Sequence, residues 1–543
     1  MGKKPEIRMY KILPYHKATG KLSLREKVGQ LFMPAAFIND TEEEVRQLEG
    51  LIRKARIGGL CFFHSRASAA TNFEGRREVI YNEQSLNRLK ALIKRYQAVS
   101  EIPLLISMDA EWGLAMRVEN TPQYPYAITL GAIRGQDVLI EQVGRQIAQD
   151  CLHSGIHWNF APVADINLNP DNPVIGYRSF GGNREEVARK ATALMKGMQA
   201  EGLLTCAKHF PGHGDTATDS HLGLPVLEKD RAALLAGELY PFSELIREGV
   251  DAVMVGHLAV PALTSAKKVA ASISPGLIGG LLRQGLGFRG AVVSDALNMH
   301  SVSKLFPGPG RLEWEAFHAG NDILCFAEHP EEGLATIQKK GSPSQIETAF
   351  QRVWGLKEKA FARRAPHTHS REEYESLLAE LATASLTLLS GRENDLAAFR
   401  TAKPTAWEVT HTPGGEFGKQ LLKQGAISKI LSMPPGARPA TDHSGEKQKV
   451  VIALYPPSVK PPNNFGISEG VLSWLNRMLH TAEVALYNFG NPYVLQLLDV
   501  QKARAVIQVY QDFPVFQRHA ARQFLGLATA EGSLPVTLKI NKS

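Results

Sequence analysis

Residues 208–221 contain three histidines, two aspartates and one lysine, side chains that can transfer protons and bind polar substrates. Pro211, Gly212 and Gly214 oppose a helix in this segment. The apolar run 203–207 precedes it and predicts a buried parallel strand. Reactive groups of α/β proteins gather at the carboxyl ends of such strands. The segment is therefore predicted to be a catalytic loop.

Asp219 and His221 are two residues apart, so they face the same side of an extended segment. A carboxylate bonded to one imidazole nitrogen fixes the tautomer and favours the protonated ring. The other nitrogen then donates or accepts a proton. The pair is predicted to act in general acid/base catalysis.

Asp295 directly follows the apolar run 290–294, where an ionisable group interrupts a predicted strand. Aspartates in such positions form covalent glycosyl intermediates when a second group protonates the leaving oxygen and then activates water. His221 is the candidate for that second group. The alternative is that Asp295 caps the amino end of a helix at a strand-to-helix junction.

Other interpretations of these residues remain open. The loop offers possible metal ligands in His209, His213, Asp215, Asp219 and His221. Lys208 would repel a cation, and Pro211 opposes the helix that would place two histidine ligands on one face. We therefore expect no metal. His213 and Asp165 are expected to have structural roles, and His257 either packs at a strand end or touches substrate. Ordinary ion pairs are the alternative role of Asp109 and Arg178.

Eight short apolar segments alternate with helical patterns: 31–38, 58–63, 103–108, 157–160, 203–207, 252–256, 290–294 and 322–326. Eight strand–helix units are typical of a TIM barrel, although a doubly wound sheet alternates similarly. Asp109, Lys208, His257 and Asp295 each follow a segment, and a barrel brings all strand ends to one mouth. The turn-rich loop 172–183 carries Arg178 and is predicted to reach over this mouth.

A helical pattern over 344–364 precedes the predicted domain boundary, which gives domains 1–365 and 366–543. In the second domain, strand-like runs alternate with helical patterns, and the last run is also strand-like: 386–389, 450–454, 484–487, 505–509 and 534–540. This alternation predicts a smaller three-layer α/β/α sandwich.

The composition of the 543 residues, 44% hydrophobic and 21% charged, is that of a globular protein and excludes fibrous or disordered classes. The net charge of +8 is scattered, so we expect no nucleic-acid partner. Cys61, Cys151, Cys206 and Cys325 lack paired spacing and are expected to be reduced. Neither a signal-peptide core nor a run of about 18 apolar residues occurs. We expect a cytoplasmic protein with no membrane span, or a secreted protein or lipoprotein if a leader was removed.

Several motifs together closely resemble glycoside hydrolase family 3, in its β-N-acetylglucosaminidase branch. They are Lys208-His-Phe-Pro-Gly-His-Gly-Asp215, Asp219-Ser-His221, Asn172-Pro-Val-Ile-Gly-x-Arg-Ser-Phe180, Asn159-Phe-Ala-Pro-Val163 and Ser294-Asp295-x-Leu-x-Met299. The resemblance covers the barrel half almost completely. Gly490-Asn-Pro-Tyr493 and Gly532-x-Leu-Pro-Val536 are weaker signs of the family's second domain.

The resemblance implies a retaining hydrolysis in which Asp295 attacks the anomeric carbon and His221, paired with Asp219, is first acid and then base. It assigns sugar contacts to Asp109, Arg178, Lys208 and His209, and it implies no cofactor. The implied substrate is a small carbohydrate ending in N-acetylglucosamine (GlcNAc), such as a muropeptide from bacterial cell-wall turnover or a chitooligosaccharide.

One motif departs from the family pattern. The branch commonly has Asp-Gln-Glu-Gly-Gly where this chain has Asp109-Ala-Glu-Trp-Gly113. This difference concerns the side of the site that would bind the leaving group. A histidine acid/base does not repel an incoming anion, so phosphorolysis is an alternative to hydrolysis. Further alternatives are a β-glucosidase or β-xylosidase of the same family, a substrate-assisted hexosaminidase, and a sugar-binding protein without activity.

Overall fold

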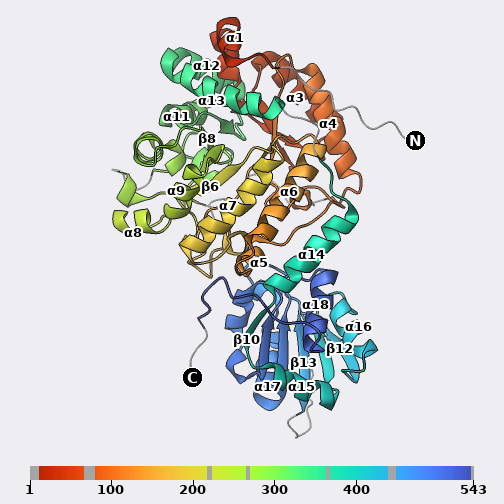
Figure 1. Ribbon diagram of the computed structural model, residues 1–543. Coiled ribbons are helices and arrows are strands. Elements are labelled where there is room, and N and C mark those ends of the chain that lie inside the picture. Colours follow the sequence, from red (N-terminus) through yellow and green to blue (C-terminus); the bar gives the residue numbers. More distant parts are fainter. Residues whose placement is uncertain are drawn as a thin grey trace, which may run out of the picture. The chain divides into compact units, whose positions relative to one another are not determined.

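The chain folds into two units, each of which packs mainly within itself (Figure 1). In this computed structural model the described residues are 12–66, 80–216, 223–264, 269–362, 367–437 and 448–539. The barrel unit comprises Met1–Tyr124, Glu141–Asp165 and Ala191–His369, and the sandwich unit comprises Pro125–Ile140, Ile166–Lys190 and Ser370–Ser543. The predicted boundary at 365 falls in 363–366, outside the described residues, and stays a prediction.

Each of the eight predicted apolar segments overlaps a strand of the barrel unit, and the first is divided at Pro34. The strands are β1 (Phe32–Met33), β2 (Ala35–Phe37), β3 (Gly59–Phe63), β4 (Leu105–Met108), β5 (Trp158–Asn159), β6 (Cys206–Phe210), β7 (Ala252–Val255), β8 (Ala291–Ser294) and β9 (Leu324–Cys325). All of their pairings are parallel, in the orders β2-β3-β4-β5, β6-β7-β8 and β1-β9.

Isolated bridges join these three sheets into a closed barrel. Trp158 pairs with Leu204 between β5 and the start of the β6 segment, and Val293 pairs with Ile323 between β8 and the β9 segment. Because β1 continues into β2 after Pro34, the pairing of β1 with β9 closes the circle. The TIM barrel predicted from the sequence is confirmed.

The strand before the predicted catalytic loop is longer than expected. It was predicted to end at residue 207, but β6 runs to Phe210. The backbone of Lys208 donates to the carbonyl of Pro162 at 3.2 Å and accepts from the amide of Ala164 at 2.7 Å. Lys208 and His209 therefore lie inside the last part of the strand, and the predicted turn begins only at Pro211.

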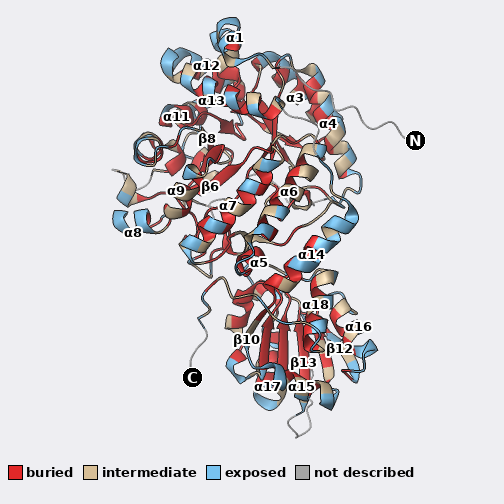
Figure 2. Cartoon of the chain, in the orientation of Figure 1, coloured by how far each residue is buried: buried red, intermediate tan, exposed pale blue. Residues whose placement is uncertain are grey.

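Helices surround the barrel, with their exposed faces outward and buried strands inside (Figure 2). They are α1 (Tyr15–Lys21), α2 (Leu24–Gly29), α3 (Glu42–Ala55), α4 (Ser85–Val99), α6 (Asp137–His153), α7 (Arg184–Ala200), α8 (Arg231–Ala236), α9 (Tyr240–Arg247), α10 (His300–Ser303), α11 (Arg311–Ala319), α12 (Pro330–Lys340) and α13 (Pro343–Phe361). A π-helix (Gly276–Gly285) and the 3-10 turns η1 (Leu114–Met116), η3 (Pro261–Leu263) and η4 (Ala271–Ile273) complete this unit.

Helix α13 is the helix predicted over 344–364. It packs against the first described residues of the chain. The indole of Trp354 donates to the carbonyl of Leu13 at 2.8 Å, and Glu347 accepts from Tyr15 at 2.6 Å. Lys357 is completely buried and donates to Gln30 Oε1 at 2.5 Å and to the carbonyl of Pro103 at 2.7 Å. Burial lowers the pKa of the Lys357 ammonium to about 7.

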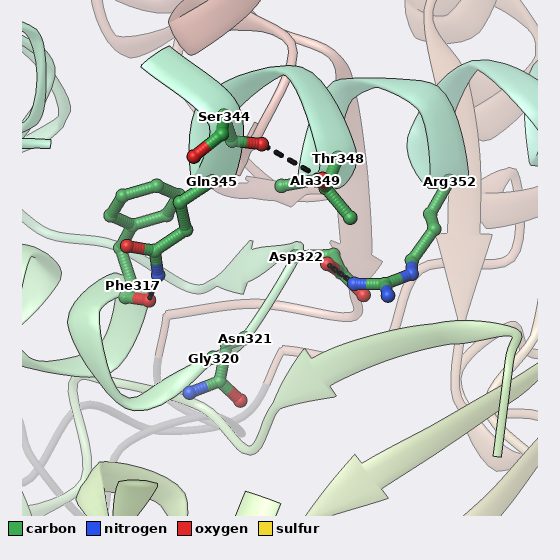
Figure 3. Close-up of a pocket in the computed structure, with 9 residues that line it drawn as sticks. All are labelled: Phe317, Gly320, Asn321, Asp322, Ser344, Gln345, Thr348, Ala349 and Arg352. Atoms are coloured by element: carbon green, nitrogen blue, oxygen red, sulfur yellow. Dashed lines mark hydrogen bonds and ion pairs between the residues drawn. The ribbon is translucent and has the colours of Figure 1, made fainter. Parts of the chain in front are cut away.

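Arg352 of α13 reaches Asp322, just before β9, at 3.0 Å (Figure 3). These two residues line a hollow of about 230 Å³ between α11 and α13. Because Asp322 precedes its strand, the hollow lies at the amino ends of the barrel strands. It is therefore opposite to the end where the sequence predicts chemistry.

The sandwich unit contains a six-stranded sheet in the order β10-β15-β14-β13-β11-β12, parallel except for β10. The strands are β10 (Thr387–Ser390), β11 (Thr405–Val409), β12 (Lys429–Met433), β13 (Lys449–Leu454), β14 (Glu483–Asn488) and β15 (Ala505–Gln508). The helices are α5 (Ala127–Gly131), α14 (Arg371–Ser385), α15 (Glu393–Ala402), α16 (Glu416–Lys423), α17 (Glu469–Thr481) and α18 (Pro514–Phe524), with the 3-10 turns η2 (Gly176–Arg178), η6 (Asn464–Gly466), η7 (Pro492–Leu497) and η8 (Val500–Lys502).

Neighbouring residues of β14 show that helices cover both faces of this sheet. The ring of Tyr487 contacts Phe417 of α16 and Phe524 of α18. Leu486 points the other way, into a core shared with Trp474 of α17. The predicted three-layer sandwich is confirmed, with β11 and β12 as strands that the sequence did not predict. The strand expected at 534–540 was wrong, because residues 531–539 contain no strand.

Two further expectations concern cysteines and membranes. All four cysteines are buried and free, as predicted. Within the ranges that the structure describes, no helix combines the length and the apolar character needed to cross a bilayer.

Candidate active site

An ion-pair network lies at the carboxyl ends of β4 and β6. Asp109 follows β4, and its Oδ1 accepts from Lys208 Nζ at 2.8 Å. Lys208 also contacts Glu111 Oε1 at 2.7 Å, and Arg117 contacts Asp109 Oδ2 at 3.2 Å. Burial alone would raise the pKa of Asp109, but the charges of Lys208 and Arg117 outweigh it and lower that pKa. The network thus keeps Asp109 ionised.

The segment after β4 is shaped by β5 and by a glycine. Asn159 of β5 accepts from the amide of Ala110 and donates to its carbonyl, both at 2.9 Å. Gly113 has a φ of +92°, and a Cβ there would lie 2.8 Å from the ring of Tyr124. Only glycine fits this position without strain. These constraints hold Asp109 and Glu111 on the side of Lys208.

A second group centres on the completely buried carboxylate of Asp165. Its Oδ2 lies 2.7 Å from His209 Nδ1 and 3.2 Å from the His209 amide, and its Oδ1 accepts from the His213 amide at 2.7 Å. One carboxylate therefore holds both ends of the turn from His209 to His213. Asp165 braces the loop, as one sequence interpretation expected.

His213 is buried below this turn. Its ring lies 6.0 Å from that of His209, and its Nδ1 is 2.7 Å from Thr216 Oγ1. Burial, together with repulsion from His209, lowers the pKa of His213 to about 4. The side chain is therefore neutral at pH 7, in agreement with the structural role expected for it.

Asp295 lies at the carboxyl end of β8 and is partly exposed. Its amide donates to the carbonyl of Val255 at 3.0 Å, and its Oδ1 accepts from the amide of Ala296 at 2.8 Å. The next helix, α10, begins at His300 with Met299 as its cap residue. The alternative role of Asp295 as a helix cap is therefore excluded.

His257 packs beneath this strand end. It is fully buried, its Nε2 donates to the carbonyl of Ala296 at 2.9 Å, and its Nδ1 is 2.7 Å from Ser272 Oγ. Of its two predicted roles, the structure favours packing, which fixes the backbone next to Asp295.

Asp109 and Asp295 lie at the same end of the barrel, because Asp109 follows β4 and Asp295 follows β8. A hydrogen bond with Cys61 and burial raise the pKa of the Cys325 thiol, and the charges of both carboxylates raise it further. The barrel mouth brings together Asp109, Lys208, His209 and Asp295.

Asp219 and His221 lie in 217–222, outside the described residues. Lys229, which follows these residues, forms ion pairs with Asp215, which precedes them, at 2.7 Å and with Glu238 at 2.5 Å. Asp215 is thus engaged in an ion pair. No group of three or more metal-ligating side chains occurs in the part of the chain that the structure describes.

Arg178 belongs to the sandwich unit, where it ends η2. Its guanidinium donates to the carbonyl of Val174 at 3.1 Å. A sugar contact by Arg178 stays a prediction.

Sequence reasoning did not select Glu111 or Arg117 as site residues. Glu111 could have been found from its spacing of two from Asp109 along an extended segment. Arg117 gives no such signal, because its contacts with Asp109 and with the Phe63 ring, 3.7 Å from its guanidinium, depend on the turn between them.

Comparisons with known proteins agree with this geometry. The family model described as Glycosyl hydrolase family 3 N terminal domain matches residues 23–356. Beta-hexosaminidase A from Pseudoalteromonas piscicida is 32% identical over 374 residues, which cover 63% of this chain and 60% of that relative. A protein from Cellulomonas fimi named beta-N-acetylglucosaminidase/beta-glucosidase is 27% identical over 94% of this chain and 93% of its own.

Among solved structures, a glycoside hydrolase family 3 beta-N-acetylglucosaminidase from Paenibacillus sp. str. FPU-7 is similar with a TM-score of 0.76 and 28% identity. The similarity covers 96% of this chain and 100% of that one. Since the family model spans more than half of the sequence, this chain belongs to glycosyl hydrolase family 3 and is a glycoside hydrolase.

Proposed function

We propose that the protein is a retaining exo-β-N-acetylglucosaminidase that releases terminal GlcNAc from peptidoglycan fragments or chitooligosaccharides. The names of its relatives support GlcNAc as the sugar that is released. The observation that carries the proposal is the position of Asp295 at the carboxyl end of β8, in the same barrel mouth as the Lys208–Asp109 ion pair. A carboxylate there can reach a sugar whose hydroxyls are bound by the neighbouring charges.

In the first step, a carboxylate oxygen of Asp295 forms a bond to the anomeric carbon while the bond from that carbon to the leaving oxygen breaks. His221, protonated and paired with Asp219, gives its proton to the leaving oxygen. In the second step, neutral His221 takes a proton from water, and the resulting oxygen displaces Asp295. Two inversions at one carbon retain the β configuration.

The charged residues of the mouth suit the recognition of a hydroxylated ring. Asp109 accepts hydrogen bonds from sugar hydroxyls, and Lys208 and Arg117 donate to sugar oxygens. His209 is the remaining residue of the proposed sugar site. Because Lys208 and Asp109 already bond each other at 2.8 Å, their orientation is set before the sugar binds.

The test is hydrolysis of 4-nitrophenyl β-GlcNAc by the wild type and the variants Asp295→Asn and His221→Ala. We expect kcat to fall roughly 10⁴-fold or more in Asp295→Asn and by about 10² to 10⁴-fold in His221→Ala. The matched control is Asp230→Asn, because Asp230 caps α8 through the amide of Ala233 and asparagine caps a helix equally well. Full activity of Asp295→Asn would refute the mechanism.

Two comparisons separate the alternatives. Turnover of the β-GlcNAc substrate should exceed that of the matching β-glucoside and β-xyloside, and the reverse order would assign a β-glucosidase or β-xylosidase. Adding phosphate should leave the product as free GlcNAc. Formation of a sugar phosphate would instead identify a phosphorylase that uses the same glycosyl intermediate.

A further inference from the structure

We infer that Asp165 is a positioning residue, which holds the His209 imidazole in one tautomer and orientation for contact with the substrate. The inference rests on the proposed function in one respect, namely that His209 touches the sugar. The tautomer itself is a property of the protein without substrate.

The hydrogen bonds around Asp165 define the tautomer. An ionised carboxylate only accepts hydrogen bonds, so the 2.7 Å contact between Asp165 Oδ2 and His209 Nδ1 requires a proton on Nδ1. In the neutral ring, Nε2 then carries the lone pair. A sugar hydroxyl can donate to this atom, whereas the opposite tautomer would present an N–H group there.

Asp165 also fixes where the ring can lie. Its two oxygens accept from the amides of His209 and His213, so the carboxylate cannot rotate without breaking one of these bonds. With a fully buried side chain, the carboxylate has little room to follow a displaced ring. The orientation of His209 is therefore coupled to the turn that leads into the predicted catalytic loop.

Two titratable neighbours of His209, His213 and Lys208, are bonded to other groups. The His213 ring is bonded to Thr216, 2.7 Å away. The ammonium of Lys208 is bonded to Asp109 and Glu111. The Asp165 carboxylate, in contrast, contacts the His209 ring directly.

The tautomer is measured by ¹⁵N NMR of the wild-type protein with labelled histidine, in which the His209 signals are identified by their loss in His209→Gln. We expect a proton on Nδ1 and an unprotonated Nε2 at alkaline pH. A proton on Nε2 with a bare Nδ1 would overturn the inference. This readout needs no activity, so it stands even if the proposed substrate is wrong.

Kinetics then test whether Asp165 acts through His209. We expect Asp165→Asn to lower kcat/KM for 4-nitrophenyl β-GlcNAc at least about tenfold in the wild type, but much less in the His209→Gln background. Equal losses in both backgrounds would mean a purely structural role and would overturn the inference.

The matched control is Asp251→Asn. Asp251 is another buried aspartate that accepts from a backbone amide, that of Thr205 at 2.9 Å, but it precedes β7 at the amino ends of the strands. We expect this variant to lose stability with little change in kcat/KM. A loss of kcat/KM equal to that of Asp165→Asn would show that destabilisation alone explains the effect and would count against the inference.

Discussion

Lys208 Nζ lies 2.8 Å from Asp109 Oδ1, and this ion pair joins β6 to β4 across the intervening β5. The Lys208 side chain is only 2% exposed and contacts a second carboxylate, that of Glu111. A buried lysine with two acidic partners is stable only while all three are charged and in place. The network therefore couples the stability of the barrel mouth to the charges that the proposed sugar site uses.

Replacing Lys208 by methionine should cost about 3 kcal/mol of unfolding free energy, because Asp109 and Glu111 are left without their shared cation. Adding Glu111→Gln should restore part of the stability, so that the two changes are not additive. The double variant should remain inactive, since the ammonium that would contact the sugar is missing. Urea denaturation and kinetics measure both effects, and additive stability losses would disprove the coupling.

His213 should make the protein sensitive to acid. Its pKa is about 4 in the folded state and near 6.5 when unfolded, so the unfolded chain binds more protons between these values. The stability contribution of the neutral ring is present above pH 6.5 and is lost as pH falls toward 4, by roughly 3 kcal/mol in total. In His213→Asn, the unfolding free energy should decline less steeply over this window. Parallel pH curves for both proteins would be evidence against the buried neutral ring.

Lys357 should have its effect at alkaline pH. Its folded pKa of about 7 lies below its unfolded value near 10.4, so the unfolded state binds the extra proton between them. The wild type should therefore gain stability relative to Lys357→Met as pH rises above 7, by about 1.4 kcal/mol per unit. Urea denaturation at pH 6, 7.5 and 9 measures the difference. If the gap between the two proteins stayed constant, Lys357 would not titrate in this range.

A metal chelator should not reduce activity. The proposed mechanism uses carboxylates and imidazoles, and Asp215, one of the possible metal ligands, is paired with Lys229 at 2.7 Å. Activity is measured before and after dialysis against EDTA, with Zn²⁺ added back to a portion. Loss on dialysis that Zn²⁺ restores would support the metal alternative for the loop.

The barrel could be predicted because its strands are buried on both faces and appear as continuous apolar runs. Two strands of the sandwich unit lacked this signal. β12 is an edge strand with mostly exposed or half-exposed residues, and β11 places Glu408 among apolar residues. The run at 534–540 gave a false signal: the carbonyl of Pro535 accepts from the amide of Gly182, and the amide of Lys539 donates to the side chain of Gln496. These partners belong to different segments, so no ladder forms.

The site was predictable where the chemistry is local and not where it depends on folding. Asp295 follows an apolar run, so its position at a strand end was evident from the sequence. Lys208 was placed in a loop, because a charged residue argues against a buried strand until its partners are known. The contact between Asp165 and His209 joins residues 44 positions apart, which no spacing rule in one sequence reveals.

The central claim is that Asp295 forms a covalent bond to the sugar, and trapping that bond tests it most directly. A 5-fluoro-β-GlcNAc substrate with an activated leaving group slows breakdown of the intermediate. After a brief reaction, the intact mass should rise by one fluorinated N-acetylglucosaminyl unit, and peptide mapping should locate it on Asp295. An adduct on a different residue would contradict the account. So would a wild-type mass that stays unchanged during turnover, if the Asp295→Asn variant also keeps its activity.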